Sequence, residues 1–129
     1  MASTTLCDYQ VLRGSSFTLN AATNETELTL FFEVPDDFEF GTSARRPILA
    51  FLMHPREDCR FTIFLNAREI FELSFDQGNT RGIWKAFSAT TAFPEGASFP
   101  NPAPLRIFVN EGRVTFSDVV MWYQIKRNE

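Results

Sequence analysis

One nine-residue stretch collects side chains of the kinds that hold sugars on protein surfaces. It covers residues 76–84, reads DQGNTRGIW, and lies between two predicted strands. Asp76, Asn79 and Arg81 can hydrogen-bond hydroxyl groups, and the indole of Trp84 can stack on the C–H face of a sugar ring. These four residues are therefore candidate ligand-binding residues.

A second aromatic group stands near the end of the chain, where Trp122 and Tyr123 precede Gln124. Two rings beside an amide offer the same chemistry, so Trp122 and Tyr123 join the candidate ligand-binding residues. The competing interpretation buries each indole in the core or in an interface, because Trp is highly buried on average. The solvent exposure of Trp84, Trp122 and Tyr123 distinguishes a ligand platform from core.

Catalytic groups are scarce in this sequence. His54 is the one histidine, neither cysteine stands in a known nucleophile context, and there is no Gly-x-Ser-x-Gly turn. Two acidic residues could meet in space, as they do in glycosidases, but none of the sixteen is marked by its position. The sequence therefore indicates a protein that is not an enzyme.

Metal ligands are equally sparse. One His and two distant Cys do not supply the three or four ligands of a zinc site. Asp36, Asp37 and Glu39 gather three carboxylates on one loop, and Ca²⁺ prefers oxygen ligands, but their spacing is not that of an EF-hand. An ordinary solvated loop is the favoured interpretation here and at residues 76–79. We expect no cofactor.

Charge and hydropathy exclude further classes of protein. The net charge is −4, and the longest basic run, Arg45-Arg46, is too short for a phosphate-binding surface. No apolar run approaches the roughly 20 residues of a transmembrane helix, and the first residues do not resemble a signal peptide. We expect no nucleic-acid partner, no membrane span, and a protein that is cytoplasmic or released without a signal peptide. Cys7 and Cys59 form either two thiols or one disulfide.

Alternating apolar and polar residues predict the elements that must position these groups. The strongest strands are 27–34, 60–66 and 105–109, and others are predicted at 6–12, 17–19, 48–53, 69–75, 83–87 and 114–125. Hairpin turns are predicted at 66–68 and at 110–112, with Gly112 at positive φ. The pattern predicts an all-β fold, an antiparallel two-sheet β-sandwich of jelly-roll type with eight or nine strands, as a single domain over residues 1–129.

Two segments, 67–75 and 118–126, carry capping residues that would also suit short helices. Strands are favoured because β-branched and aromatic residues dominate the second segment. The alternation loses its phase at Ser117-Asp118. One extra residue in a strand turns the following side chains to the opposite face, so we predict a β-bulge there.

Phenylalanine accounts for fifteen of the nineteen aromatic residues, which suits the slab between two packed sheets. The alternation nevertheless points Phe31, Phe64 and Phe108 away from the predicted core. Such a face is not expected to meet water uncovered. A second layer, a long loop or a partner chain must cover it, and a homo-oligomer is one solution.

The last quarter of the chain resembles a known family. Strand 104–109, the turn through Gly112 and a final strand with Asp118 near its start are similar to the last hairpin of galactose-binding-like jelly rolls, a fold that many carbohydrate-binding modules share. The resemblance implies a jelly roll and glycan binding. It assigns no binding residue, because no binding motif of the family is matched.

Two functions are consistent with these observations. The first is a non-catalytic binding module with lectin-like recognition of a carbohydrate. The alternative is a structural or assembly protein that forms a homo-oligomer through sheet faces or edges.

Overall fold

Each strand predicted from the alternation has a counterpart in the computed structural model. The model describes residues 3–35, 38–39, 47–75, 84–90 and 100–128, with only the backbone at 3–6, 38–39, 90 and 126–128. The described part contains strands and turns but no helix, so the helical alternatives for 67–75 and 118–126 are wrong. Accordingly, no helix in these ranges could cross a membrane.

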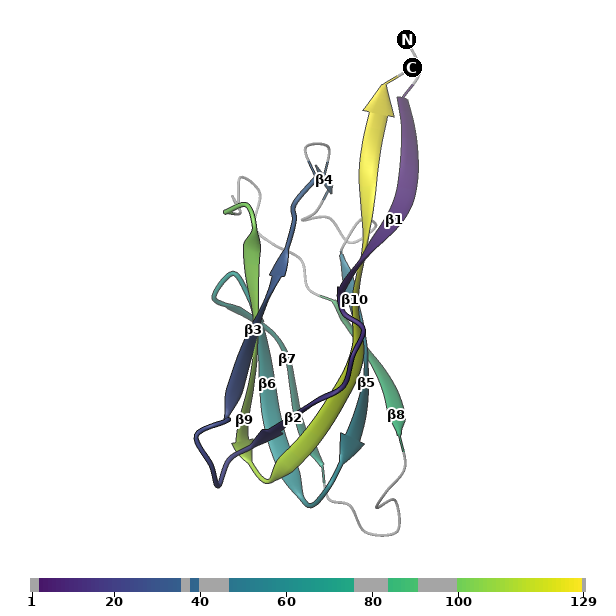
Figure 1. The fold of residues 1–129 in the computed structure, drawn as a ribbon. Coiled ribbons are helices and arrows are strands. Elements are labelled where there is room, and N and C mark those ends of the chain that lie inside the picture. Colours follow the sequence, from purple (N-terminus) through teal and green to yellow (C-terminus); the bar gives the residue numbers. More distant parts are fainter. Residues whose placement is uncertain (1–2, 36–37, 40–46, 76–83, 91–99, 129) are drawn as a thin grey trace.

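Six strands form the first sheet, here called sheet A. They are β1 (Ser3–Arg13), β2 (Phe17–Asn20), β4 (Phe38–Glu39), β5 (Ile48–Pro55), β8 (Lys85–Thr90) and β10 (Arg113–Asn128). The order is β1-β10-β5-β8, with β2 and β4 also paired to β10, and every pairing is antiparallel. The two-residue strand β4 had no counterpart in the predicted pattern. Figure 1 shows β1 and β10 extending together as a ribbon beyond the rest of the sheet.

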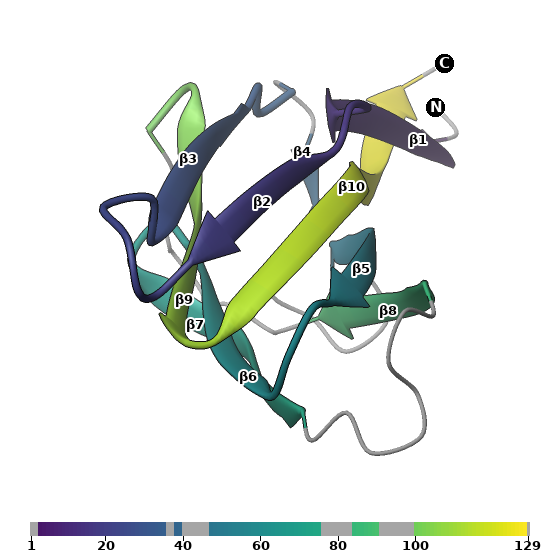
Figure 2. The ribbon, with the colours of Figure 1, turned by 60° about the horizontal axis from the view of Figure 1, so that its bottom comes forward.

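Four strands form the second sheet, sheet B. They are β3 (Glu27–Phe32), β6 (Cys59–Leu65), β7 (Arg68–Phe75) and β9 (Ala103–Glu111), in the antiparallel order β3-β9-β6-β7. The two sheets face each other as layers, as the turned view in Figure 2 shows. The fold class predicted from the sequence, an antiparallel two-sheet sandwich, is confirmed.

The core lies between the inward faces of the two sheets. The predicted inward residues of β6 and β9 are all buried: Phe61, Ile63, Leu65, Leu105, Ile107 and Val109. Phe61 from sheet B meets Phe116 from sheet A edge to face, with ring centroids 5.1 Å apart. Three more rings pack around them: Phe51, Phe71 and Phe87. Phenylalanine therefore fills the slab between the sheets, as its abundance predicts.

The outward phenylalanines are also where the alternation places them. Phe31 is 56% exposed, whereas Phe64 and Phe108 are partly buried. The guanidinium of Arg106 lies over the Phe64 ring, 4.7 Å from its centroid. The outer face of sheet B is thus part aromatic and only partly covered by its own side chains.

Turn geometry agrees with the predicted hairpins. Asn66 and Ala67 both have positive φ, 50° and 68°, as a two-residue type I′ turn requires. Gly112 has a φ of 78° between β9 and β10. The predicted bulge is present as well, because the β10–β5 register shifts between Ser117 and Val120, and Asp118 has a φ of 52°.

Both cysteines are free thiols. Cys7 is exposed on β1 in sheet A, whereas Cys59 is buried on β6 in sheet B. Of the two alternatives left by the sequence, the single disulfide is wrong.

Candidate functional site

The bulge in β10 decides which aromatic residues of this strand reach solvent. Before it, Val114 and Phe116 point into the core, and after it Val119, Met121 and Tyr123 do so. The phase has therefore moved by one residue, which turns Trp122 outward. A continuous strand would have exposed Tyr123 and buried the indole.

Trp122 pairs with a ring that the sequence analysis did not single out. Tyr9 on β1 lies directly opposite Trp122 in the register, and the two ring centroids are 5.0 Å apart with their planes tilted by 38°. Trp122 is 46% exposed and Tyr9 is 53% exposed. Val11 and Ile48 are exposed beside them on the same face of sheet A. These four residues, Tyr9, Val11, Ile48 and Trp122, are called the Tyr9–Trp122 surface below.

A hollow of about 230 Å³ lies at the edge of this surface. It is lined by Cys7, Ile48, Trp122, Tyr123 and Gln124. The Gln124 amide nitrogen Nε2 donates a hydrogen bond to the Cys7 sulfur at 3.8 Å. The amide oxygen Oε1 of Gln124 is buried and has no hydrogen-bond partner. A buried acceptor without a partner is costly, and because this oxygen is buried, a ligand hydroxyl reaches it only when the Gln124 side chain turns toward the hollow.

Tyr123 belongs mainly to the core. It is 8% exposed, and its ring packs against Phe32 with centroids 5.4 Å apart. It also borders a larger polar cleft of about 540 Å³ at the end of the sandwich, together with Gln10, Glu33 and Asn101.

The amides of that polar cleft already have backbone partners. Gln10 exchanges two hydrogen bonds of 2.8 Å with the backbone N–H and carbonyl of Glu33. Asn101 holds the backbone of Val34 in the same way, at 3.2 and 3.3 Å. These side chains fasten β1 and the segment before β9 to the end of β3. The hollow beside Trp122 differs from this cleft, because the amide oxygen of Gln124 has no hydrogen-bond partner among the described residues.

Trp84 lies elsewhere on the same face of sheet A. It is 44% exposed, and its ring stacks on His54 with centroids 5.2 Å apart. His54 and Ile48 are six residues apart on the outward side of β5, which separates them by roughly 20 Å. The structure therefore does not bring Trp84 and Trp122 together. Both indoles are half exposed, so the interpretation that buries them in the core is wrong.

His54 is buried, and within the part of the chain that the structure describes neither of its ring nitrogens has a hydrogen-bond partner. A catalytic His is oriented by a hydrogen bond to a carboxylate or carbonyl, and this one has no such bond. Its neighbour across the strand pair, Thr115, hydrogen-bonds Thr18 at 2.8 Å instead. The geometry around His54 is that of a packed residue under Trp84.

Several predicted residues lie outside the described residues. These are Asp76, Asn79 and Arg81 of the candidate sugar loop and Asp36 and Asp37 of the weak calcium candidate. Glu39 is described only as backbone in β4. Among the residues that the structure does describe, no group of three His, Cys, Asp or Glu side chains could hold a metal ion.

No family model and no curated protein sequence matches the chain. Solved structures are similar in fold. Latent PorU from Porphyromonas gingivalis has a TM-score of 0.59 and 14% identity over 95% of this chain, which spans 13% of the PorU chain. The C-terminal domain of EclA, described as a sugar-binding protein, has a TM-score of 0.50 and 11% identity, covering 98% of this chain and 81% of that one.

A third similar structure is the C-terminal CBM6 of LamC, a marine laminarinase from Zobellia galactanivorans. It has a TM-score of 0.45 and 12% identity, covering 84% of this chain and 99% of that one. At these identities a likeness establishes the fold alone. The predicted resemblance is confirmed as a similarity of fold, with the EclA domain at a TM-score of 0.50.

Proposed function

We propose that this chain is a non-catalytic, lectin-like module that binds a carbohydrate on the Tyr9–Trp122 surface. The observation that carries the proposal is the pair of half-exposed rings, held in register on one sheet face beside an unpaired amide oxygen. Stacking on Trp122 and Tyr9 would hold the C–H face of a sugar. The Gln124 amide, once turned toward the hollow, would accept a hydrogen bond from one of its hydroxyls.

The position of the surface favours a binding role. It lies on three hydrogen-bonded strands, β1, β10 and β5, whose pairing sets the positions of the two rings before a ligand arrives. Preorganised side chains lose little conformational entropy on binding. His54 lies roughly 20 Å away along the sheet, too far to act on a ligand stacked at Trp122.

The fold supports the same class of function. The EclA domain of similar fold is described as sugar-binding, and its likeness extends over 98% of this chain. Fold alone does not assign a ligand, so the proposal depends on the aromatic surface and takes only its plausibility from the fold.

A glycan array followed by titration tests the proposal. The bound glycan should quench or shift tryptophan fluorescence, and Trp122→Ala should weaken its affinity at least about tenfold. Trp84→Ala is the matched control, because it removes an indole of nearly equal exposure from the far end of the same sheet. It should leave the affinity unchanged.

The opposite result is also informative. Full binding by the Trp122→Ala variant would place any glycan site elsewhere, and loss in the Trp84→Ala variant would move it to the neighbourhood of residues 76–84. No binding to any glycan by the folded protein would refute a carbohydrate function.

One specific observation supports the alternative of an assembly protein. Phe31 is 56% exposed on β3, an edge strand of sheet B, which is the kind of surface that self-association covers. Sedimentation velocity over a range of concentrations tests it. A dimer that Phe31→Ser converts to a monomer would favour assembly, and a monomer at all concentrations would remove the hypothesis.

A further inference from the structure

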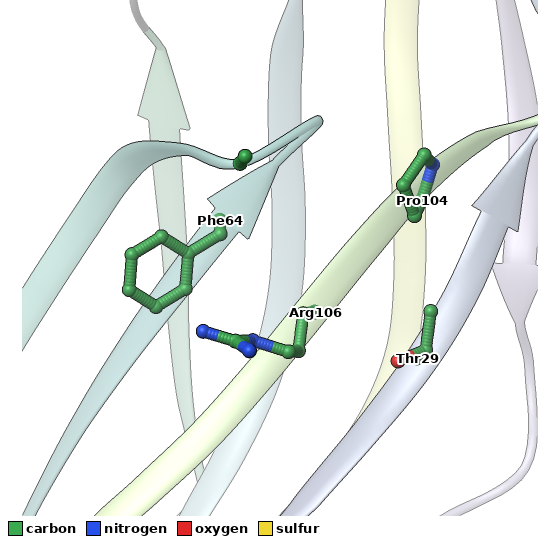
Figure 3. Close-up of a pocket in the computed structure, with 5 residues that line it drawn as sticks. Thr29, Phe64, Pro104 and Arg106 are labelled. Atoms are coloured by element: carbon green, nitrogen blue, oxygen red, sulfur yellow. The ribbon is translucent and has the colours of Figure 1, made fainter. Parts of the chain in front are cut away.

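The outer face of sheet B contains a second hollow, on the opposite side of the sandwich from the Tyr9–Trp122 surface. Its volume is about 270 Å³, and it is lined by Thr29, Phe64, Ala67, Pro104 and Arg106. Thr29, Arg106 and Phe64 form one row across β3, β9 and β6, because Arg106 is opposite both of the others in the register. Figure 3 shows the four labelled side chains around this space, with Arg106 reaching toward the ring of Phe64.

The chemistry of the lining is a cation set among apolar groups. Arg106 is the one charged residue of the five that line the hollow, and Phe64, Ala67 and Pro104 supply apolar surface. The guanidinium carbon is 4.7 Å from the Phe64 ring centroid, so the ring fixes where the guanidinium lies. Thr29 adds a hydroxyl on the other side of Arg106.

The neighbouring carboxylates pair with only part of the Arg106 guanidinium. The Glu27 carboxylate lies 3.6 Å from the Nε atom of Arg106, and both side chains are about half exposed, so this ion pair is weak. Glu69 stands opposite Phe64 in the β6–β7 register. Its carboxyl hydrogen-bonds Glu72, which raises the pKa of Glu69. Among the described residues, none hydrogen-bonds the two terminal nitrogens of Arg106, which a ligand carboxylate could therefore engage.

We infer that this hollow binds a carboxylated sugar, a uronic acid residue, and the inference rests on the proposed carbohydrate-binding function. The volume is below that of drug-sized pockets and suits one sugar ring. Phe64 and Pro104 contact the ring, Arg106 pairs with the carboxylate, and Thr29 hydrogen-bonds a hydroxyl. An arginine–carboxylate pair is stronger than a neutral hydrogen bond, so the site prefers uronic acids to neutral sugars.

Two probes that differ in a single group test the inference. Methyl β-D-glucuronide carries a carboxylate where methyl β-D-glucoside carries a hydroxymethyl group. Each is titrated into the full chain while backbone amide shifts are followed by NMR. The glucuronide should shift the amides of Thr29, Phe64 and Arg106. The affinity of the glucoside, obtained from the same amides, should be at least about tenfold lower.

Two variants complete the experiment. Arg106→Gln should weaken the glucuronide about tenfold or more. Arg60→Gln removes a similar charge from the outward side of β6, outside the hollow, and should leave the affinity unchanged. The amide spectrum of each variant shows directly that it is folded.

The outcomes separate this inference from the proposed function. Equal binding of the two sugars, no binding of the glucuronide, or full binding by Arg106→Gln overturns the inference. If a glycan still binds at Trp122, the proposed function stands without it. A short peptide with a free C-terminal carboxylate serves as a third ligand. If the peptide shifts these amides and the glucuronide does not, the hollow is a peptide site and the sugar assignment is overturned.

Discussion

Tyr9 and Trp122 are cross-strand neighbours in the β1–β10 register, and their ring centroids are 5.0 Å apart although the residues are 113 positions apart in the sequence. Each ring shields one side of the other and leaves the remaining side to solvent. Such a pair is stabilising in itself, so the surface has a structural role in addition to the proposed binding role.

A double-mutant cycle measures the first role. Tyr9→Ala and Trp122→Ala should each reduce the free energy of unfolding by a small amount, because both rings are half exposed. The cycle should give a coupling of about 0.5–1 kcal/mol, the usual value for an aromatic pair. Urea unfolding of the four proteins provides the numbers. Strictly additive losses would show that the rings are adjacent without interacting.

The backbone conformation and close neighbours of Gly112 leave no room for a side chain at this position. It has a φ of 78°, and a Cβ there would overlap the main chain of Asp58 and Cys59. Gly112→Ala should therefore lower the free energy of unfolding by on the order of 2 kcal/mol or more. Gly14→Ala is the control, since its Cβ would meet only the Val11 side chain at an ordinary 3.9 Å. It should change stability by less than about 1 kcal/mol.

Truncation of a buried phenylalanine should lower stability far more than truncation of an exposed one. Phe116 is fully buried and packs on Phe17, Phe51 and Phe61, so Phe116→Ala should cost about 3–5 kcal/mol. Phe31 is mostly exposed, and Phe31→Ala should stay within about 0.5 kcal/mol of the parent. Thermal or urea unfolding checks both. A large loss in the Phe31 variant would mean that something covers this ring in solution.

Ala67 offers a stabilising substitution. It occupies the second central position of a type I′ turn with a φ of 68°, where a residue with a Cβ is strained. Ala67→Gly creates the Asn-Gly pair that this turn prefers. It should raise the free energy of unfolding by about 1 kcal/mol, and an unchanged or lower stability would contradict the assigned turn.

Cys59 should make stability depend on alkaline pH. Burial, followed by the charges of Asp58, Glu111 and Glu57, raises the pKa of this thiol from 9.0 to about 11. The unfolded chain therefore loses the thiol proton above pH 9 while the folded chain keeps it, so this contribution is complete below pH 9 and is lost as pH rises toward 11.

A variant isolates that contribution from the other groups that titrate in the same range. The stability advantage of the parent over Cys59→Ala should shrink between pH 9 and 11 in urea unfolding. A constant difference would contradict the raised pKa. In the folded parent, the exposed Cys7 should react with a thiol reagent at pH 8 and Cys59 should not.

Much of the fold could be predicted because its signals are local. Alternation located the strands, Asn66 and Gly112 marked their turns, and the phase loss at Ser117 and Asp118 located the bulge. The two-residue strand β4 was missed because two residues cannot display a period of two.

The candidate sites were less predictable because they are built from residues distant in sequence. The phase change at the bulge could have placed Trp122 outward, but the average burial of Trp favoured the opposite interpretation. Tyr9 and Arg106 are part of the candidate sites only because a neighbouring strand places an aromatic residue beside them. That residue is Trp122 for Tyr9 and Phe64 for Arg106. Strand register is set by long-range pairing that a single sequence does not reveal.

The position of β10 in the sheet has a consequence for biosynthesis. Within the described part of the chain, β1, β2 and β4 pair with β10 and with no other strand of sheet A. On the ribosome, residues 3–20 emerge before residues 113–128 and lack their pairing partner in sheet A until those residues follow. Nascent chains arrested before residue 113 should therefore remain open to protease at residues 3–20. Closure of sheet A must therefore wait until residues 113–128 have left the ribosome and can pair with residues 3–20.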